Sequence, residues 1–369
     1  MSLSHGANNN DKGALPHSFP MTDAPPIYSL LPVNVALLRH LSLNLPAMGL
    51  DLDSLLLREG YRADTLLEEQ KDVPALVLEK LLGHCLDETG DELFGFHLGQ
   101  RVKPEGFGVV GYIRQACQNL QNFILVCIRY EHLISGLGKT RLLQEPGRSL
   151  WCWSANTLNP TFQRHATEFM LAVLHSTKAL LKPTDYPWLL EVQFEHDAPS
   201  TQGAREEIES YFGCRVRYNQ SQNALALDPR ALTHPFSSAD PDLMHSLERH
   251  AQSLEAAQVD KGFYYQAYQT MKSLVLSKRA SKQNLAQALG ISSRHLHRQL
   301  AREHINYRTL HDQVLLTQAI DALSESNRTI EDIALALGYT ESQSFIRWFK
   351  KQTGQTPSRY RESTLSQPR

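Results

Sequence analysis

The sequence contains no apolar run near the roughly 18 consecutive residues that a membrane-spanning helix requires, so a membrane protein is not expected. Cysteine is scarce, and the five residues are scattered without a CxxC pair, which favours reduced thiols over a disulfide framework. The first 26 residues lack an apolar segment flanked by positive charge, so they predict a disordered tail and no secretory signal. These absences predict a cytoplasmic protein.

Motifs for catalysis and cofactor binding are absent or misplaced. The sequence has no GxSxG motif, and no cysteine can be paired with a base, so we expect neither an enzyme nor a cofactor. Residues 106–111 spell GxGxxG, but the polar stretch before them is no buried strand, which argues against a dinucleotide-binding turn. His165, His175 and His196 lie near Glu168 in the sequence, yet their spacing fits no single helical face, and no metal site is expected.

Charge is distributed unevenly along the 369 residues, a length that itself favours two domains. Residues 270–369 hold 15 Lys and Arg against 8 Asp and Glu, whereas the rest of the chain holds 22 against 31. This asymmetry suggests a C-terminal module that binds a polyanion, joined to a domain with another task.

The C-terminal hundred residues contain an internal duplication. The segments 285–292 (LAQALGIS) and 333–340 (IALALGYT) match, 48 residues apart. In each, a short helix ends at a Gly, which tolerates the left-handed turn, and a hydroxyl residue, Ser292 or Thr340, can cap the next helix. The second unit also opens with a capping-box pattern over Thr329–Asp332. The pattern predicts helix, glycine turn and helix, twice.

The second helix of each unit has an apolar side and a polar side. Leu296/Leu300 and Phe345/Phe349 recur at i, i+4 and predict the buried side. The opposite side carries Arg, which contacts guanine bidentately, Gln, which pairs with adenine, and Ser and Lys, which hold phosphates. The candidate DNA-binding residues are Ser293, Arg294, His297, Arg298, Ser342, Gln343, Arg347 and Lys350.

The residues that follow the second glycine turn form a recognisable motif. They are 338–351 (GYTESQSFIRWFKK), Gly354, Thr356, Pro357, Tyr360 and Arg361. This motif closely resembles the C-terminal signature of AraC/XylS-type bacterial regulators. The resemblance implies seven helices in two helix-turn-helix units, joined by a linker helix near 307–324, that read successive major-groove segments about 34 Å apart. Its implied partners are double-stranded DNA and, for an activator, RNA polymerase.

The N-terminal part mixes helical and strand patterns. Apolar residues recur at helical spacing over 161–181, whereas 189–194, 215–218 and 223–227 alternate or run apolar like strands. We therefore predict a mixed fold class, with an α+β N-terminal domain over 27–257.

An all-α, double helix-turn-helix domain follows over 263–362. The predicted organisation is completed by the tail over 1–26, a junction over 257–261 and a second tail over 363–369.

A further helix begins at Asp240-Pro241, with Asp as the cap and Pro at the first helical position. Its apolar side carries Leu243, Leu247, His250 and Leu254. Periodicity does not distinguish the two ways of covering this side, so it packs either against its own domain or against a second subunit.

The N-terminal domain carries a weaker resemblance, through residues 106–112 (GFGVVGY), 212–214 (FGC) and 223–225 (NAL). It resembles a subclass of AraC-type regulators named for arabinose binding but lacking the cupin barrel. Such a domain implies a small-molecule effector and a homodimer, with the effector and its binding residues unknown. The aromatic residues that either line an apolar pocket or fill the core are Phe107, Tyr112, Trp151, Trp153 and Trp188.

The leading hypothesis is a transcription regulator whose N-terminal domain responds to an effector. One alternative is an enzyme whose DNA module provides autoregulation, which a turnover assay identifies. Another is a constitutive regulator whose N-terminal domain only dimerises, which no metabolite stabilises. The target promoter and the choice between activation and repression do not follow from the sequence.

Overall fold

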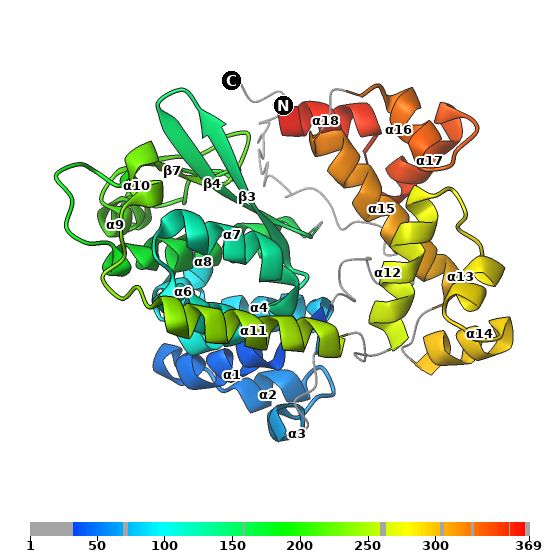
Figure 1. Ribbon diagram of the computed structural model, residues 1–369, viewed down its shortest axis with the longest axis horizontal. Helices are drawn as coiled ribbons and strands as arrows, with labels where there is room; N and C mark the ends of the chain where they lie inside the picture. The colour runs from blue at the N-terminus through cyan, green and yellow to red at the C-terminus, as the bar shows by residue number, and fades with distance from the viewer. Residues whose placement is uncertain are drawn as a thin grey trace, which may run out of the picture.

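The structure is a computed structural model that describes residues 32–68, 73–157, 159–258, 263–302, 306–325, 328–353 and 355–365. Figure 1 shows an N-terminal body of helices around a sheet and an all-helical C-terminal body. The predicted mixed fold class is therefore confirmed. The tail predicted over 1–26 and residues 259–261 of the predicted junction lie outside the described residues.

Helices make up most of the N-terminal domain. In chain order the α-helices are α1 (Val35–Asn44), α2 (Leu52–Leu57), α3 (Ala63–Glu68), α4 (Ala75–Thr89), α5 (Phe94–Gln100), α6 (Gly108–Ala116), α7 (Leu120–Tyr130), α8 (Pro160–His175), α9 (Gln202–Phe212), α10 (Pro229–Thr233) and α11 (Pro241–Gln258). The 3-10 turns are η2 (Leu45–Met48), η3 (Pro104–Phe107), η4 (Glu131–Leu133) and η5 (Ser176–Leu180). The helix predicted over 161–181 corresponds to α8 and its continuation η5.

A five-stranded mixed sheet crosses this domain in the order β3-β4-β7-β5-β6. Its strands are β3 (Gly138–Glu145), β4 (Arg148–Ala155), β5 (Leu189–Gln193), β6 (Arg215–Arg217) and β7 (Ala224–Leu227). Only β5 and β6 pair in parallel, and the other neighbours are antiparallel. The three predicted strands correspond to β5, β6 and β7, whereas the β3–β4 hairpin was not predicted. A small antiparallel sheet joins β1 (Pro32–Val33) to β2 (Val73–Pro74).

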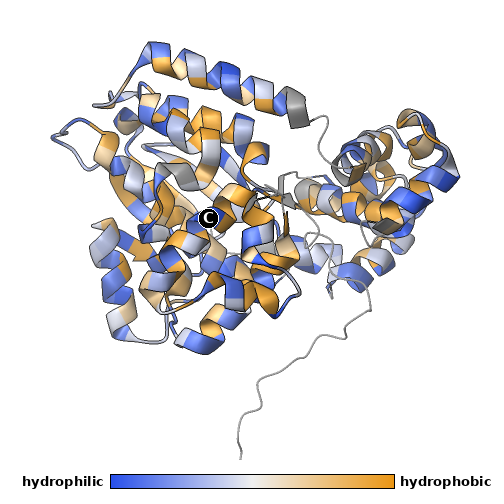
Figure 2. Cartoon of the chain, turned by 90° about the horizontal axis from the view of Figure 1, so that it is seen from below, coloured by the Kyte–Doolittle hydropathy of each residue, from blue (hydrophilic) through white to orange (hydrophobic). Residues whose placement is uncertain are grey.

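Two large hydrophobic cores lie in the N-terminal domain, whose apolar stretches are orange in Figure 2, and a smaller cluster lies on β4 and β7. One core lies among α1 to α5 and includes Leu38 and Leu56. The other lies between the sheet and α6 to α8, where the Trp151 ring meets Phe123 edge-on at 5.8 Å between centroids. Helix α8 contributes Phe162 to the first core and Leu171 to the second, so it joins the two halves of the domain.

The C-terminal domain consists of α12 (Phe263–Leu276), α13 (Lys282–Ala288), α14 (Ser293–Arg302), α15 (Tyr307–Glu325), α16 (Ile330–Ala336), α17 (Ser342–Thr353) and α18 (Pro357–Leu365). These seven helices, counted over the described part of this domain, match the number that the family resemblance implies. The linker helix expected near 307–324 is α15. Helix α18 continues into the segment 363–369 that was expected to be a tail.

Candidate functional site

Each helix-turn-helix unit turns at a glycine in the left-handed conformation. Gly290 follows α13 with φ of 67°, and Gly338 follows α16 with φ of 90°. After each glycine the backbone N–H reaches back over the turn, from Ile291 to the Ala286 carbonyl at 3.0 Å and from Tyr339 to the Ala334 carbonyl at 2.9 Å. This bonding satisfies carbonyls that the helix end leaves free, and it stops both helices in the same way.

The starts of the helices are also specified locally. The Ser292 hydroxyl accepts from the His295 N–H at 3.2 Å, as predicted. Thr329 and Asp332 form the predicted capping box at the start of α16. Thr340 was expected to cap α17. It lies two residues before Ser342, the first residue of that helix, so Glu341 and not Thr340 holds the position that precedes α17.

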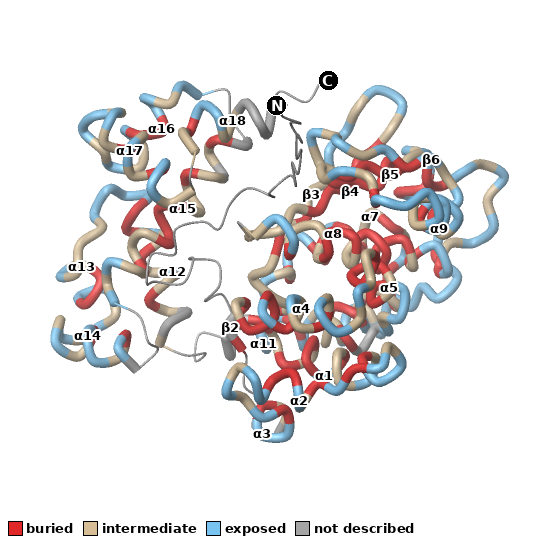
Figure 3. Tube along the Cα trace, turned by 180° about the vertical axis from the view of Figure 1, so that it is seen from behind, coloured by how far each residue is buried: buried red, intermediate tan, exposed pale blue. Residues whose placement is uncertain are grey.

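Burial of the apolar pairs sets which side of α14 and α17 faces outward. Leu296 and Leu300 in α14, and Phe345 and Phe349 in α17, are completely buried. The exposed candidate residues are Arg294, His297, Arg298, Gln343, Arg347 and Lys350, while Ser293 and Ser342 are half-buried at the helix starts. Figure 3 shows both helices with long exposed stretches. The eight candidate residues therefore lie on or beside two accessible helix faces.

The two units are held together through α15. Trp348 of α17 donates its indole N–H to Asp312 of α15 at 3.2 Å. Leu337, Tyr339 and Trp348 pack against the core of the first unit as well as that of the second. A rigid spacing between α14 and α17 follows from this shared packing. Sequence reasoning missed Asp312, because the contact joins residues 36 positions apart on different helices.

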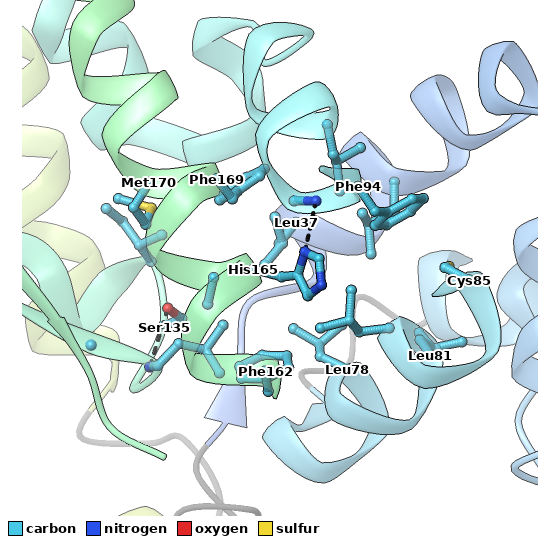
Figure 4. A pocket seen from close by; sticks show the side chains of 18 of the residues that line it. Leu37, Leu78, Leu81, Cys85, Phe94, Ser135, Phe162, His165, Phe169 and Met170 are labelled. Atoms are coloured by element: carbon cyan, nitrogen blue, oxygen red, sulfur yellow. Dashed lines mark hydrogen bonds between the residues drawn. The ribbon is translucent and has the colours of Figure 1, made fainter. Parts of the chain in front are cut away.

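A cavity of about 130 Å³ lies inside the N-terminal domain. Figure 4 shows its walls, with Leu37, Leu78, Leu81, Phe94 and Phe162 among the side chains around the space. Helices α1, α4, α5 and α8 supply most of the lining. The rest comes from the segment between η4 and the start of β3, and from Leu45, Phe107 and Trp153. The cavity thus lies where the two halves of the domain meet.

Polar side chains at the cavity wall already bond within the protein. The carboxylate of Glu131 accepts from the Thr140 N–H at 3.0 Å and from its hydroxyl at 2.8 Å. The Ser135 hydroxyl oxygen accepts from a backbone N–H two residues on, and His165 Nδ1 accepts from the Gly95 N–H at 3.3 Å. The remaining lining is almost wholly apolar, so few groups are left to recognise a polar ligand.

The predicted aromatic residues divide between the two roles left open for them. Phe107 and Trp153 line the cavity. Trp151 and Trp188 are buried in the sheet-side core, and Tyr112 is half exposed on α6. The sequence could not separate these roles, since aromatic side chains fill cores and line pockets alike.

The fold brings Glu168 together with two of the three histidines. His165 Nδ1 lies 3.7 Å from its carboxylate and His196 Nε2 lies 3.6 Å away, while the Arg164 guanidinium bonds it at 2.9 Å. Burial raises the pKa of Glu168 to about 7 and lowers the pKa of His165 to about 4. His175 lies elsewhere, against Trp188 and other rings. Within the described ranges, no group of three or more His, Cys, Asp or Glu residues is placed to hold a metal ion.

The GxGxxG stretch 106–111 spans the end of η3 and the first turn of α6. A helical turn therefore precedes it in place of the strand that a phosphate-binding turn requires. None of the helices in the described part of the chain combines the length and hydropathy of a membrane span.

Glu131 makes the stability of the N-terminal domain depend on pH. Burial raises the pKa of this carboxyl from about 4.5 to about 7, so the folded state binds its proton more tightly than the unfolded state. The stabilisation is complete below pH 4.5 and is lost as the pH rises through 7. The Glu131→Gln variant has no carboxyl at this position to titrate. Wild type therefore loses this stabilisation between pH 4.5 and 7 and the variant does not, so the unfolding free energy of the variant minus that of wild type should rise over this range.

Urea unfolding of both proteins between pH 5 and 8 measures this difference. The glutamine carbonyl accepts only one of the two Thr140 bonds, because the amide nitrogen cannot accept the other. That loss does not vary with pH, so the pH-dependent part of the difference reports the charge. A difference that stays constant across the range contradicts the assignment.

Comparison with known proteins adds to this geometry. Residues 49–236 match the family described as the arabinose-binding domain of AraC transcription regulators, and residues 285–363 match a helix-turn-helix domain family. The chain is similar to the ornithine utilization regulator of Pseudomonas aeruginosa, with 27% identity over 278 residues, which are 74% of this chain and 80% of that protein. It is also similar to the HTH-type transcriptional regulator VqsM of the same organism, with 22% identity over 73% of this chain and 83% of that protein.

A solved structure is similar over most of the length. The crystal structure of the transcriptional regulator CdpR from Pseudomonas aeruginosa covers 81% of this chain and 96% of that chain, with a TM-score of 0.40 and 20% identity.

Proposed function

The chain belongs to the AraC-type DNA-binding transcription regulators with an arabinose-binding N-terminal domain, and we propose that a small molecule bound to that domain controls its binding to DNA. The observation that supports DNA binding is the pair of exposed polar faces on α14 and α17, which α15 holds at a set spacing. The relatives named above are regulators and not enzymes, so we assign the chain no catalytic role.

We assign the two recognition helices to successive major-groove segments on one side of the duplex, about 34 Å apart. Arg294 and Arg347 are the guanine readers, and Gln343 is the adenine reader. Ser293, Ser342 and Lys350 hold phosphates, and His297 and Arg298 complete the exposed side of α14. RNA polymerase is a further partner if the regulator is an activator.

Selection of bound duplexes from a random-sequence DNA pool tests this assignment. We expect two enriched base blocks whose centres lie about 10 base pairs apart, one for each helix. A single block indicates that only one unit reads bases, and no enrichment contradicts sequence-specific binding.

Contacts within the N-terminal domain connect the cavity to the helix that precedes the DNA-binding domain. Glu131 in η4 and Ile134 just beyond it line the cavity, and His132 Nε2 of the same turn lies 3.3 Å from Glu255 Oε1 of α11. Helix α11 is the last element before α12, the first helix of the C-terminal domain. We therefore propose that an effector acts through η4 and α11, by binding one arrangement of these elements more tightly than another.

The apolar side of α11 is only partly covered by its own domain. Leu247 packs against the sheet-side core, whereas Leu243 is 46% exposed and Leu254 is 38% exposed. We propose that these two leucines contact a second subunit, which makes the regulator a homodimer.

The double variant Leu243→Asp, Leu254→Asp should weaken dimerisation at least about tenfold, because leucine burial at the interface is replaced by like charges. Sedimentation equilibrium measures the association. Leu57→Asp changes a 51% exposed leucine on α2 and is the matched control. If both proteins associate equally well, the interface lies elsewhere.

A further inference from the structure

The lining of the N-terminal cavity restricts what it can hold. A pentose such as arabinose buries several hydroxyl groups, and each one left without a partner weakens binding by about tenfold. Glu131, Ser135 and His165 already accept hydrogen bonds from the protein, which leaves capacity for about one polar group of a ligand at Glu131 and Ser135 and not for several. The leucine and phenylalanine side chains around them offer no hydrogen bonds. A sugar is therefore a poor match for this site.

The size of the cavity points to a small occupant. Its volume of about 130 Å³ is close to that of an engineered cavity of about 150 Å³, lined by similar side chains, which stays free of water and binds benzene. An apolar cavity of this size takes one ring or a compact alkyl group, because burying apolar surface drives the binding.

We propose that the effector is a small apolar molecule, with one aromatic ring or a branched alkyl group of that size, bound between α1, α4, α5 and α8. Any single polar substituent lies toward Glu131 and Ser135, the polar edge of the lining. The control of DNA binding by this ligand rests on the proposed function, whereas its binding is measured on the protein alone.

Toluene and L-arabinose are the probes, tested by thermal unfolding of the full chain. At about 100 times its dissociation constant, a ligand should raise the midpoint temperature by about 5 °C. We expect this rise with toluene and none with L-arabinose. A rise with L-arabinose alone overturns the proposal.

Two substitutions test whether toluene binds in the cavity. Ala166→Leu adds carbon atoms to the α8 wall and should abolish the shift with toluene. Leu82→Ala enlarges the space from α4 and should create a shift with naphthalene that the wild type lacks. Ala239→Leu is the control, because Ala239 is exposed and its segment does not line the cavity.

The variants keep the test decisive even if one fails to fold. A shift with toluene that persists in folded Ala166→Leu overturns the cavity assignment, and so does a failure of folded Leu82→Ala to respond to naphthalene. DNA affinity measured with and without toluene separates the two proposals. Cavity binding without any change in DNA affinity supports the ligand class and contradicts effector control.

Discussion

Replacing Arg294 or Arg347 with alanine is expected to weaken binding to a selected DNA site by about 5- to 150-fold, or about 1 to 3 kcal/mol for each. Both side chains are exposed on the polar sides of α14 and α17, opposite fully buried apolar pairs. Truncation removes a bidentate contact to guanine and leaves the base edge without its partner. Fluorescence anisotropy with the duplex selected from the random pool measures the loss.

Lysine at the same positions is the matched control. Arg294→Lys and Arg347→Lys keep the positive charge, and so the attraction to phosphate, but lose the planar fork that reads guanine. We expect the lysine variants to retain the salt dependence of wild type while discriminating poorly between bases in one block. Alanine variants that bind the selected site as tightly as wild type would refute the base-reading assignment.

The C-terminal domain was predictable because its signals are local. The glycine turns, the Thr329 capping box and the apolar pairs each lie within a few residues along the chain, where backbone geometry determines the outcome. The contact from Trp348 to Asp312 was not predictable, since it depends on how two helices pack. The role of each exposed side chain in DNA binding stays a prediction.

The N-terminal domain was less predictable, because its architecture depends on contacts between residues far apart in the sequence. Its three predicted strands exist, but their order in the sheet places β7 between β4 and β5, which no local pattern specifies. The cavity draws most of its lining from four helices, and its lining residues spread over more than 130 positions, from Leu37 to Met170. The periodic pattern predicted that such apolar residues are buried, but it does not show which of them pack loosely enough to leave a cavity.

Gly95→Ala is expected to destabilise the N-terminal domain by about 1 to 3 kcal/mol or more. A Cβ at Gly95 in α5 would lie 2.1 Å from the backbone oxygen of His165 in α8. Another at Gly99, one turn on, would lie 2.5 Å from the backbone oxygen of Phe169. Backbone atoms cannot rotate away as side chains do, so α5 must move off α8. Urea unfolding followed by tryptophan fluorescence measures the cost.

Gly83→Ala in α4 provides the control, because its Cβ meets no heavy atom within 4 Å. There alanine should stabilise the domain by up to about 1 kcal/mol through helix propensity. Equal stability of the two variants contradicts the close approach of α5 and α8. Gly95 also lines the cavity, so a displaced α5 changes the cavity wall. The loss of stability in Gly95→Ala should therefore be accompanied by loss of the shift with toluene, whereas Gly83→Ala keeps that shift.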